Sequence, residues 1–290
     1  LDRIQSSVKI ALSDSVPEVR NFAAQNFGKF YSKVVQKGVP EWLEDMLEAP
    51  NFIERSGAVQ AYSEILMRTF EWELKLEELL NNCQSNNQAK RESYLGVCIF
   101  ICWYKDFSKY LERSLPVFFE NFKHENEEVR KIAVRLVQVV IKKYFKSHLG
   151  VIMQRLEESL FSSDWRVRNS CLSVAGLVLE ITDIRSRRKK KPLLIEYRKN
   201  MLLVSVYILR FDHCGSTPEQ ATHIWKNHKS YNKHLVLELC YELLQKLLDI
   251  SQTSNSEVFE IGVDCLEKLL PKHTTQLLGS VLKVTETRTN

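Results

Sequence analysis

The sequence predicts an all-α protein, a right-handed solenoid of about seven stacked helical hairpins. One motif recurs: an apolar helix end, a polar or acidic turn, an arginine, and then small and apolar residues at helical spacing. Successive arginines of this motif are 35, 36, 39 and 38 residues apart. These arginines are Arg20, Arg55, Arg91, Arg130 and Arg168. Hydrophobic residues make up 44% of the 290 residues, and only 9 Gly and 7 Pro interrupt them, so a continuous helical core is expected.

The period of the motif identifies the kind of solenoid. Two helices per unit of roughly 35–45 residues are typical of HEAT and armadillo arrays, which act as binding scaffolds. The acidic or polar residue before each second helix can cap free N–H groups and meets the positive end of the helix dipole. The arginine can pair with the corresponding acid of a neighbouring unit. We therefore predict that the five arginines form a structural ladder through the stack.

The hairpins are expected in order along one continuous array. The first covers residues 3–35, and Pro17 fits the first turn of its second helix. The next four cover residues 41–70, 72–105, 109–145 and 149–181. A less regular sixth unit covers 193–225, where Ser216, Thr217, Pro218 and Glu219 predict a helix start. The seventh covers 233–270, and a further helix is expected to begin near Pro271. The array thus divides into residues 1–182, a basic insertion at 183–192, and residues 193–290.

The basic insertion is the most unusual segment of the chain. Six of its ten residues are basic: Arg185, Arg187, Arg188, Lys189, Lys190 and Lys191. Two interpretations stay open. The segment can be a solvated insertion without a partner, or an arm that contacts RNA phosphates and gives steep salt dependence without base specificity. A nuclear-localisation signal has the same composition. Lys142, Lys143 and Lys146 can extend a basic edge.

No catalytic or cofactor motif is present. The chain has no phosphate-binding glycine loop, no H-E-x-x-H and no G-x-S-x-G, so we expect neither an enzyme nor a cofactor. His213, Cys214, His223, His228 and His234 are close in sequence, but their spacing matches no common zinc site, and we expect no metal. Seven scattered cysteines without C-x-x-C indicate reduced, buried thiols in a cytosolic or nuclear protein. No apolar stretch has the length of a membrane span, and no signal peptide is visible.

Two segments are more specific than a generic repeat. Residues 160–170 read LFSSDWRVRNS, and residues 221–226 read ATHIWK. Both resemble segments of the general control nonderepressible protein one family, the very large HEAT-repeat coactivators of the general amino-acid control pathway. The resemblance covers nearly all of the chain and is strongest over 110–226. Pro218 and Phe259 stand where the family's repeat arginine falls, and the insertion before the sixth unit, often acidic or polar in the family, is basic here.

The resemblance implies a function. Members of this family bind stalled or collided ribosomes and promote activation of the kinase that acts on the α subunit of translation initiation factor two. It implies a cytoplasmic scaffold whose partners are ribosomal RNA and proteins, with the kinase-binding segment outside this chain, which is expected to be part of a longer array. No membrane or small-molecule partner is implied. Two alternatives stay open: an importin-type transport receptor, and a regulatory scaffold of a phosphatase or kinase.

Overall fold

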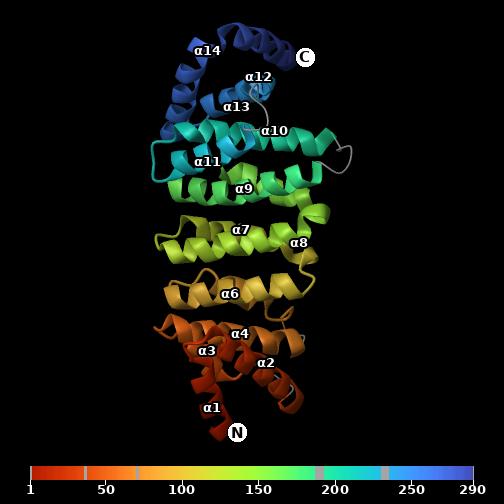
Figure 1. The fold of residues 1–290 in the computed structure, drawn as a ribbon, viewed down its shortest axis with the longest axis vertical. Coiled ribbons are helices and arrows are strands. Elements are labelled where there is room, and N and C mark those ends of the chain that lie inside the picture. The colour runs from red at the N-terminus through yellow and green to blue at the C-terminus, as the bar shows by residue number, and fades with distance from the viewer. Residues whose placement is uncertain (1, 36–37, 70–71, 187–192, 230–234, 290) are drawn as a thin grey trace. The chain divides into compact units, whose positions relative to one another are not determined.

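The computed structural model describes residues 2–35, 38–69, 72–186, 193–229 and 235–289 (Figure 1). Side chains at the ends of several helices that border the gaps, and most of those after 274, are outside this description. Every regular element in the described ranges is a helix. The prediction of an all-α chain is therefore confirmed. The chain forms two compact units, residues 1–152 and residues 153–290.

The first unit consists of helix pairs that follow one another as layers in chain order (Figure 1). The pairs are α1 (Asp2–Leu12) with α2 (Pro17–Val34), α3 (Glu41–Leu47) with α4 (Phe52–Thr69), α5 (Leu76–Asn82) with α6 (Gln88–Tyr104), and α7 (Leu111–Glu120) with α8 (Glu127–Ser159). Two short 3₁₀ helices, η1 (Ser108–Tyr110) and η2 (Asn121–Lys123), flank α7. These bounds agree with the four hairpins expected from the repeat.

The second unit contains the end of α8 and the helices that follow it. These are α9 (Trp165–Ser186), α10 (Leu193–Ile208), η3 (Leu209–Phe211), α11 (Thr217–Lys229), α12 (Leu235–Glu238), α13 (Cys240–Ser251) and α14 (Ser256–Thr289). Helix α11 begins at Thr217 with Pro218 in its first turn, as the sequence predicts. The boundary between the two compact units lies within α8. The division of the array at residues 183–192 stays a prediction.

One predicted helix boundary is confirmed and another is wrong. The sequence predicts a break between residues 145 and 149, and α8 consists of two helices joined by a kink at His148, whose backbone angles are non-helical (φ −129°, ψ 25°). A helix end was expected at Leu270, but α14 continues through Pro271 to Thr289. A proline loses one backbone hydrogen bond, but its ring holds φ near the helical value, so a helix can continue through it.

An Asn or Asp side chain caps the start of most second helices. The caps accept a hydrogen bond from an N–H in the first turn, at oxygen–nitrogen distances of 2.8–3.2 Å. These caps are Asn51, Asn87, Asn126, Asp164 and Asn255. Each satisfies a backbone donor that the helix leaves free. The predicted capping is thus present, although four of the five caps are amides rather than acids.

Close approach of helices within the first unit depends on a glycine. A Cβ atom at Gly57 would lie 2.0 Å from the carbonyl oxygen of Leu12, which no side chain could tolerate. Leu12 is fully buried, as are Ala58 and Ala61 on the same face of α4. Small residues at this spacing therefore allow α4 to lie directly against the end of α1.

Candidate functional site

The five repeat arginines share one contact that the sequence did not reveal. Each side chain turns back and donates hydrogen bonds to two adjacent backbone carbonyls in the turn before its own helix, at 2.6–3.1 Å. The acceptors belong to Asp14 and Ser15, Ala49 and Pro50, Gln84 and Ser85, His124 and Glu125, and Ser162 and Ser163. Carbonyls at the end of a helix lack backbone partners and carry the negative end of the dipole. Each arginine therefore joins the two helices of its own hairpin.

Three of the five arginines also reach a residue of the following helices. Arg55 forms a 2.7 Å ion pair with Glu92 of α6, and both side chains are nearly buried. Arg91 donates to the amide oxygen of Asn121 in η2 at 3.4 Å. In the described part of the chain, Arg20 and Arg130 form no ion pair. The contacts therefore extend from hairpin to hairpin at some positions, and a ladder through all five stays a prediction.

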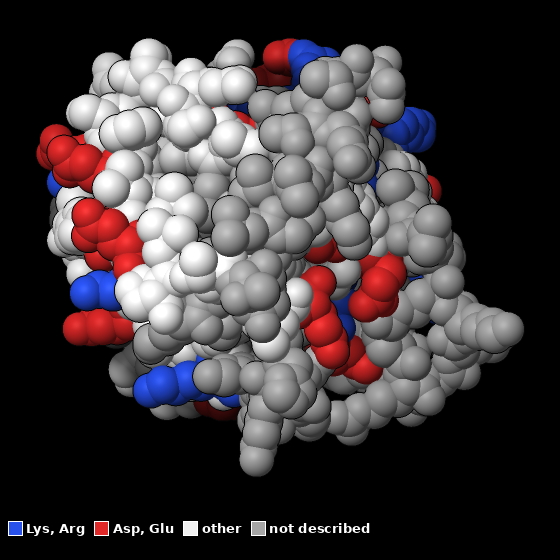
Figure 2. All heavy atoms as spheres, turned by 90° about the horizontal axis from the view of Figure 1, so that it is seen from above, with Lys and Arg blue, Asp and Glu red and all other residues white. Residues whose placement is uncertain are grey.

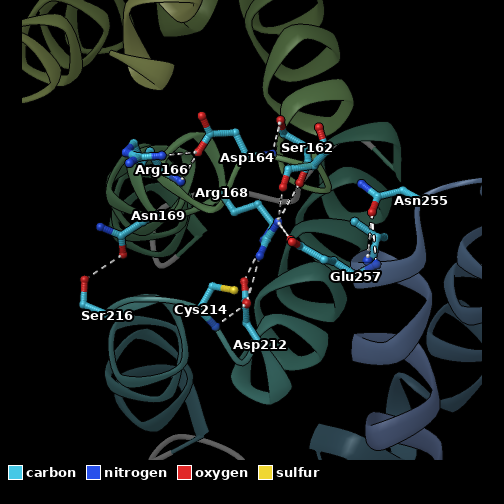
Figure 3. A network of polar contacts seen from close by, with 12 residues as sticks. Ser162, Asp164, Arg166, Arg168, Asn169, Asp212, Cys214, Ser216, Asn255 and Glu257 are labelled. Atoms are coloured by element: carbon cyan, nitrogen blue, oxygen red, sulfur yellow. Dashed lines mark hydrogen bonds and ion pairs between the residues drawn. The ribbon is translucent and has the colours of Figure 1, made fainter. Parts of the chain in front are cut away.

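Arg168 is the third arginine that reaches a following element, and it lies at the centre of a buried polar network (Figure 3). Arg168 is 0% exposed and forms a bidentate pair with Asp212, with Nε–Oδ2 at 2.7 Å and Nη2–Oδ1 at 2.9 Å. Glu257 of α14 lies 3.5 Å from the same guanidinium. Asp212 also accepts a bond from the N–H of Cys214 at 2.9 Å. The network thus holds α9, the turn after η3 and the start of α14 together.

The segment 221–226 has a packing role on one face and is exposed on the other. Trp225 is 2% exposed and meets Tyr207 edge-on, with ring centroids 4.8 Å apart. The guanidinium of Arg210 lies 4.9 Å from the Tyr207 ring centre and 5.9 Å from that of Trp225. His223 and Lys226, by contrast, are exposed. Trp225 therefore stabilises the contact between α10 and α11, and only its neighbours are open to a partner.

The predicted RNA-contacting segment cannot be placed in the structure. Arg187, Arg188, Lys189, Lys190 and Lys191 lie outside the described residues. Arg185 lies in the last turn of α9, but its side chain is also outside the description.

A cluster of charged side chains lies beside this segment and was missed by the sequence analysis. Asp183, the first residue of the basic insertion, pairs with Lys199 of α10 at 2.5 Å and with His228 of α11 at 2.7 Å. Burial raises the pKa of Asp183, but hydrogen bonds from His228 and Lys199 outweigh this effect, and the pKa falls to about 2. The cluster connects α9, α10 and α11, and α9 and α10 are the helices on either side of the basic segment in the sequence.

Lysines of the predicted basic edge differ in their surroundings. The ammonium of Lys143 donates to the carbonyls of Cys102, Trp103 and Lys105, at 3.0, 2.9 and 2.5 Å. Burial lowers the pKa of Lys143. All three lysines are exposed, but the ammonium of Lys143 is bonded to carbonyls at the end of α6, whereas Lys142 and Lys146 have no acidic partner in the described residues.

The histidines near Cys214 form separate contacts. His213 lies 2.7 Å from Asp264, His228 pairs with Asp183, and His234 is outside the described residues. Among the side chains that the structure does describe, no three His, Cys, Asp or Glu come together as a metal site.

None of the described helices is both long and apolar enough to cross a bilayer.

The charges on the end face of the molecule are mixed (Figure 2). On the described part of that face, Asp and Glu side chains lie in small groups with Lys and Arg side chains beside them (Figure 2). This part of the face therefore does not provide a continuous basic surface.

The fold and the turn-capping arginines define the class, a HEAT-like helical-repeat protein. A crystal structure of importin beta matches 98% of the chain and 41% of its own length, with a TM-score of 0.53 and 15% identity. This likeness shows the fold alone, and it confirms the predicted helical solenoid. No protein-family model matches the chain.

Curated relatives make the particular resemblance explicit. The chain is 25% identical over 318 residues to the eIF-2-alpha kinase activator GCN1 of Dictyostelium discoideum, and 22% identical over 315 residues to the stalled ribosome sensor GCN1 of Homo sapiens. Each alignment covers 99% of this chain and 12% of the relative. The resemblance found from residues 160–170 and 221–226 is thus confirmed over nearly the entire chain, which spans about an eighth of the length of these relatives.

Proposed function

We propose that this chain is a non-enzymatic part of a cytoplasmic scaffold that binds stalled or collided ribosomes. In the whole protein, this binding promotes activation of the kinase acting on the α subunit of translation initiation factor two. One observation carries the proposal: similarity over 99% of the chain to proteins named as a stalled ribosome sensor and as activators of that kinase. Kinase contact is assigned to regions outside this chain.

The repeat architecture explains how such a scaffold works without an active site. Stacked hairpins offer an extended surface on which many weak contacts add up. The basic segment is the proposed RNA contact, through Arg185, Arg187, Arg188, Lys189, Lys190 and Lys191. Its cations would release counterions from phosphates, which makes binding strongly salt-dependent. The cluster around Asp183 supports this assignment because it anchors the helices on both sides of the segment.

A sucrose gradient tests the proposal. Lysate from cells that make the full-length protein is compared with and without an elongation inhibitor at a dose that causes ribosome collisions. We expect movement into the disome fractions, reversed by about 0.5 M salt. A protein that stays at the top of the gradient in both samples would refute ribosome binding.

Replacement of the six basic residues by Ser tests the segment itself. The matched control replaces six basic residues that already have acidic partners: Arg68, Lys75, Lys109, Arg113, Lys123 and Lys131. We expect the segment variant to sediment less with ribosomes and to show a weaker salt dependence than the control. Unchanged sedimentation and salt dependence would exclude the segment as an RNA contact.

Two other functions share the fold. Importin-type receptors bind basic cargo on acidic inner surfaces, and the likeness to importin beta concerns the fold only. The second alternative function is that of a regulatory scaffold of a phosphatase or kinase. Affinity purification separates the three: ribosomal proteins support the proposal, a small GTPase supports transport, and a catalytic phosphatase subunit supports the regulatory scaffold.

A further inference from the structure

Helix α6 ends in two exposed aromatic side chains. Trp103 is 52% exposed and Tyr104 is 63% exposed. Tyr104 stacks on Phe100 one turn earlier, with ring centroids 6.3 Å apart and planes at 17°. Large aromatic side chains are normally more buried than this, and an exposed pair is a feature of surfaces that bind a partner.

Contacts between α6 and α8 set the surroundings of this pair. The hydroxyl of Tyr144 donates to the Lys105 carbonyl, 39 positions earlier, and accepts from the N–H of Phe107 at 2.7 Å. Lys143 donates to the Trp103 carbonyl in the same place. Trp103 and Lys142, which are also 39 positions apart, therefore occupy equivalent places on neighbouring helices.

The neighbouring side chains make this surface basic. Lys142 and Lys146 are one helical turn apart on α8, both are exposed, and neither has an acidic partner within the described residues. The ammonium of Lys143 offsets the negative carbonyl end of α6, which would otherwise repel an anion. Asp106 interacts with Lys143, and its pKa is lowered chiefly by the hydrogen bond from the Ser108 N–H. The charge of Asp106 is therefore offset by Lys143, and Lys142 and Lys146 add positive charge beside it in the sequence of α8.

We propose that Trp103, Tyr104, Lys142 and Lys146, called the α6–α8 corner below, bind single-stranded or looped RNA. Unpaired bases stack on the two rings while the lysines contact the adjoining phosphates. Duplex RNA does not fit, because its bases are already stacked on one another. An acidic peptide would use the lysines but would leave the exposed rings without a function. The inference rests on the proposed function in one respect: ribosome binding makes ribosomal RNA the expected ligand.

Fluorescence polarisation with the purified 290-residue chain and a labelled 12-nucleotide single-stranded RNA tests the corner. For the double variant W103A/Y104A we expect at least about tenfold weaker binding, from the loss of base stacking. Phe52→Ala is the control, because Phe52 is also exposed (64%) but lies on α4. For K142S/K146S we expect the slope of log K against log salt to shrink by about 1.4. The charge-matched control is K123S/K131S, whose ammonium groups pair with glutamates.

Tryptophan fluorescence gives a direct readout of stacking. Of the five tryptophans, Trp103 alone is exposed, while Trp42 and Trp165 are half-buried and Trp72 and Trp225 are buried. RNA should therefore quench the emission of the wild-type chain, and Trp103→Phe should abolish the quenching while retaining most of the affinity. Duplex RNA of the same length should not quench.

The outcomes are separable from those of the ribosome experiment. Unchanged affinity in W103A/Y104A together with no quenching of Trp103 would overturn the α6–α8 corner, even if the full-length protein moves into disome fractions. Specific quenching by single-stranded RNA would uphold the corner, even if the full-length protein stayed at the top of the gradient. Binding of an acidic peptide with the same loss in W103A/Y104A would replace RNA by a protein partner and overturn the proposal.

Discussion

Replacement of Arg168 by Met should destabilise the second unit, residues 153–290, by about 3–5 kcal/mol, the usual cost of removing one member of a buried ion pair. Asp212 would remain as a carboxylate whose side chain is 1% exposed and has lost both guanidinium bonds. The carbonyls of Ser162 and Ser163 would also lose their donor. Each unpaired buried acceptor adds to the loss, since its desolvation is no longer offset.

A double-mutant cycle separates the pair from the packing. In R168M/D212L both charges are replaced by apolar side chains, so no buried charge is left unpaired. We expect the double variant to lose less free energy of unfolding than the two single variants lose together, by about 2–4 kcal/mol. A coupling energy near zero would refute the view that the two groups depend on each other.

Arg20 provides the comparison, because it holds the equivalent position in the first hairpin. It bonds to the carbonyls of Asp14 and Ser15 but has no acidic partner in the described residues. Arg20→Met should therefore cost only about 1–2 kcal/mol. The assay is urea unfolding followed by circular dichroism, with hydrogen exchange to report α9, α11 and α14 separately, because repeat proteins can unfold in parts. Equal losses in the Arg20 and Arg168 variants would contradict the argument from burial.

Three further predictions concern packing, pH and helix ends. Gly57→Ala should cost about 1–3 kcal/mol by overpacking, whereas Gly150→Ala, whose Cβ would meet open space, should be neutral or stabilising in thermal unfolding. The folded-state pKa of Asp183, about 2, lies below its unfolded value, so its contribution of about 2 kcal/mol is present above pH ~4 and is lost as pH falls towards 2. Asp183→Asn should remove that part of the acid transition, measured as the difference in urea unfolding between the two proteins. Lys143→Met should cost about 0.5–1.5 kcal/mol by removing the donor of three helix-end carbonyls, and Lys142→Met should have little effect.

Periodicity made the helical hairpins predictable, because the spacing of apolar residues along the chain indicates which side of each helix faces the core. The predicted hairpins and the bounds of α2, α4, α6 and α11 agree within a few residues. The kink of α8 at His148 also lies between the predicted units 109–145 and 149–181. The continuation of α14 through Pro271 was not predictable in the same way, because a proline usually ends a helix.

The contacts of the candidate site were harder to predict than the hairpins. The arginines are visible in the sequence, but they bond to backbone carbonyls, which every residue type has. Their acidic partners are far away in sequence: Glu92 is 37 positions from Arg55, and Asp212 is 44 positions from Arg168. Which acid meets which arginine depends on how neighbouring helices are aligned, and residue type alone does not determine that alignment. The exposed pair at the end of α6 was hidden for the same reason, since apolar residues in a helix are expected to be buried.

Helix α14 shows that the capping residue and the arginine of the repeat have separate structural roles. Asn255 caps α14 through the N–H groups of Glu257 and Val258, at 3.1 and 3.4 Å, although Phe259 stands where the first five units have arginine. The cap is therefore a local requirement of the helix start, and it persists without the arginine. Glu257, in the first turn of this helix, lies instead beside Arg168 of α9. The arginine joins a helix to the turn before it, and in α14, which lacks this arginine, a charged group from an earlier unit contacts the helix start.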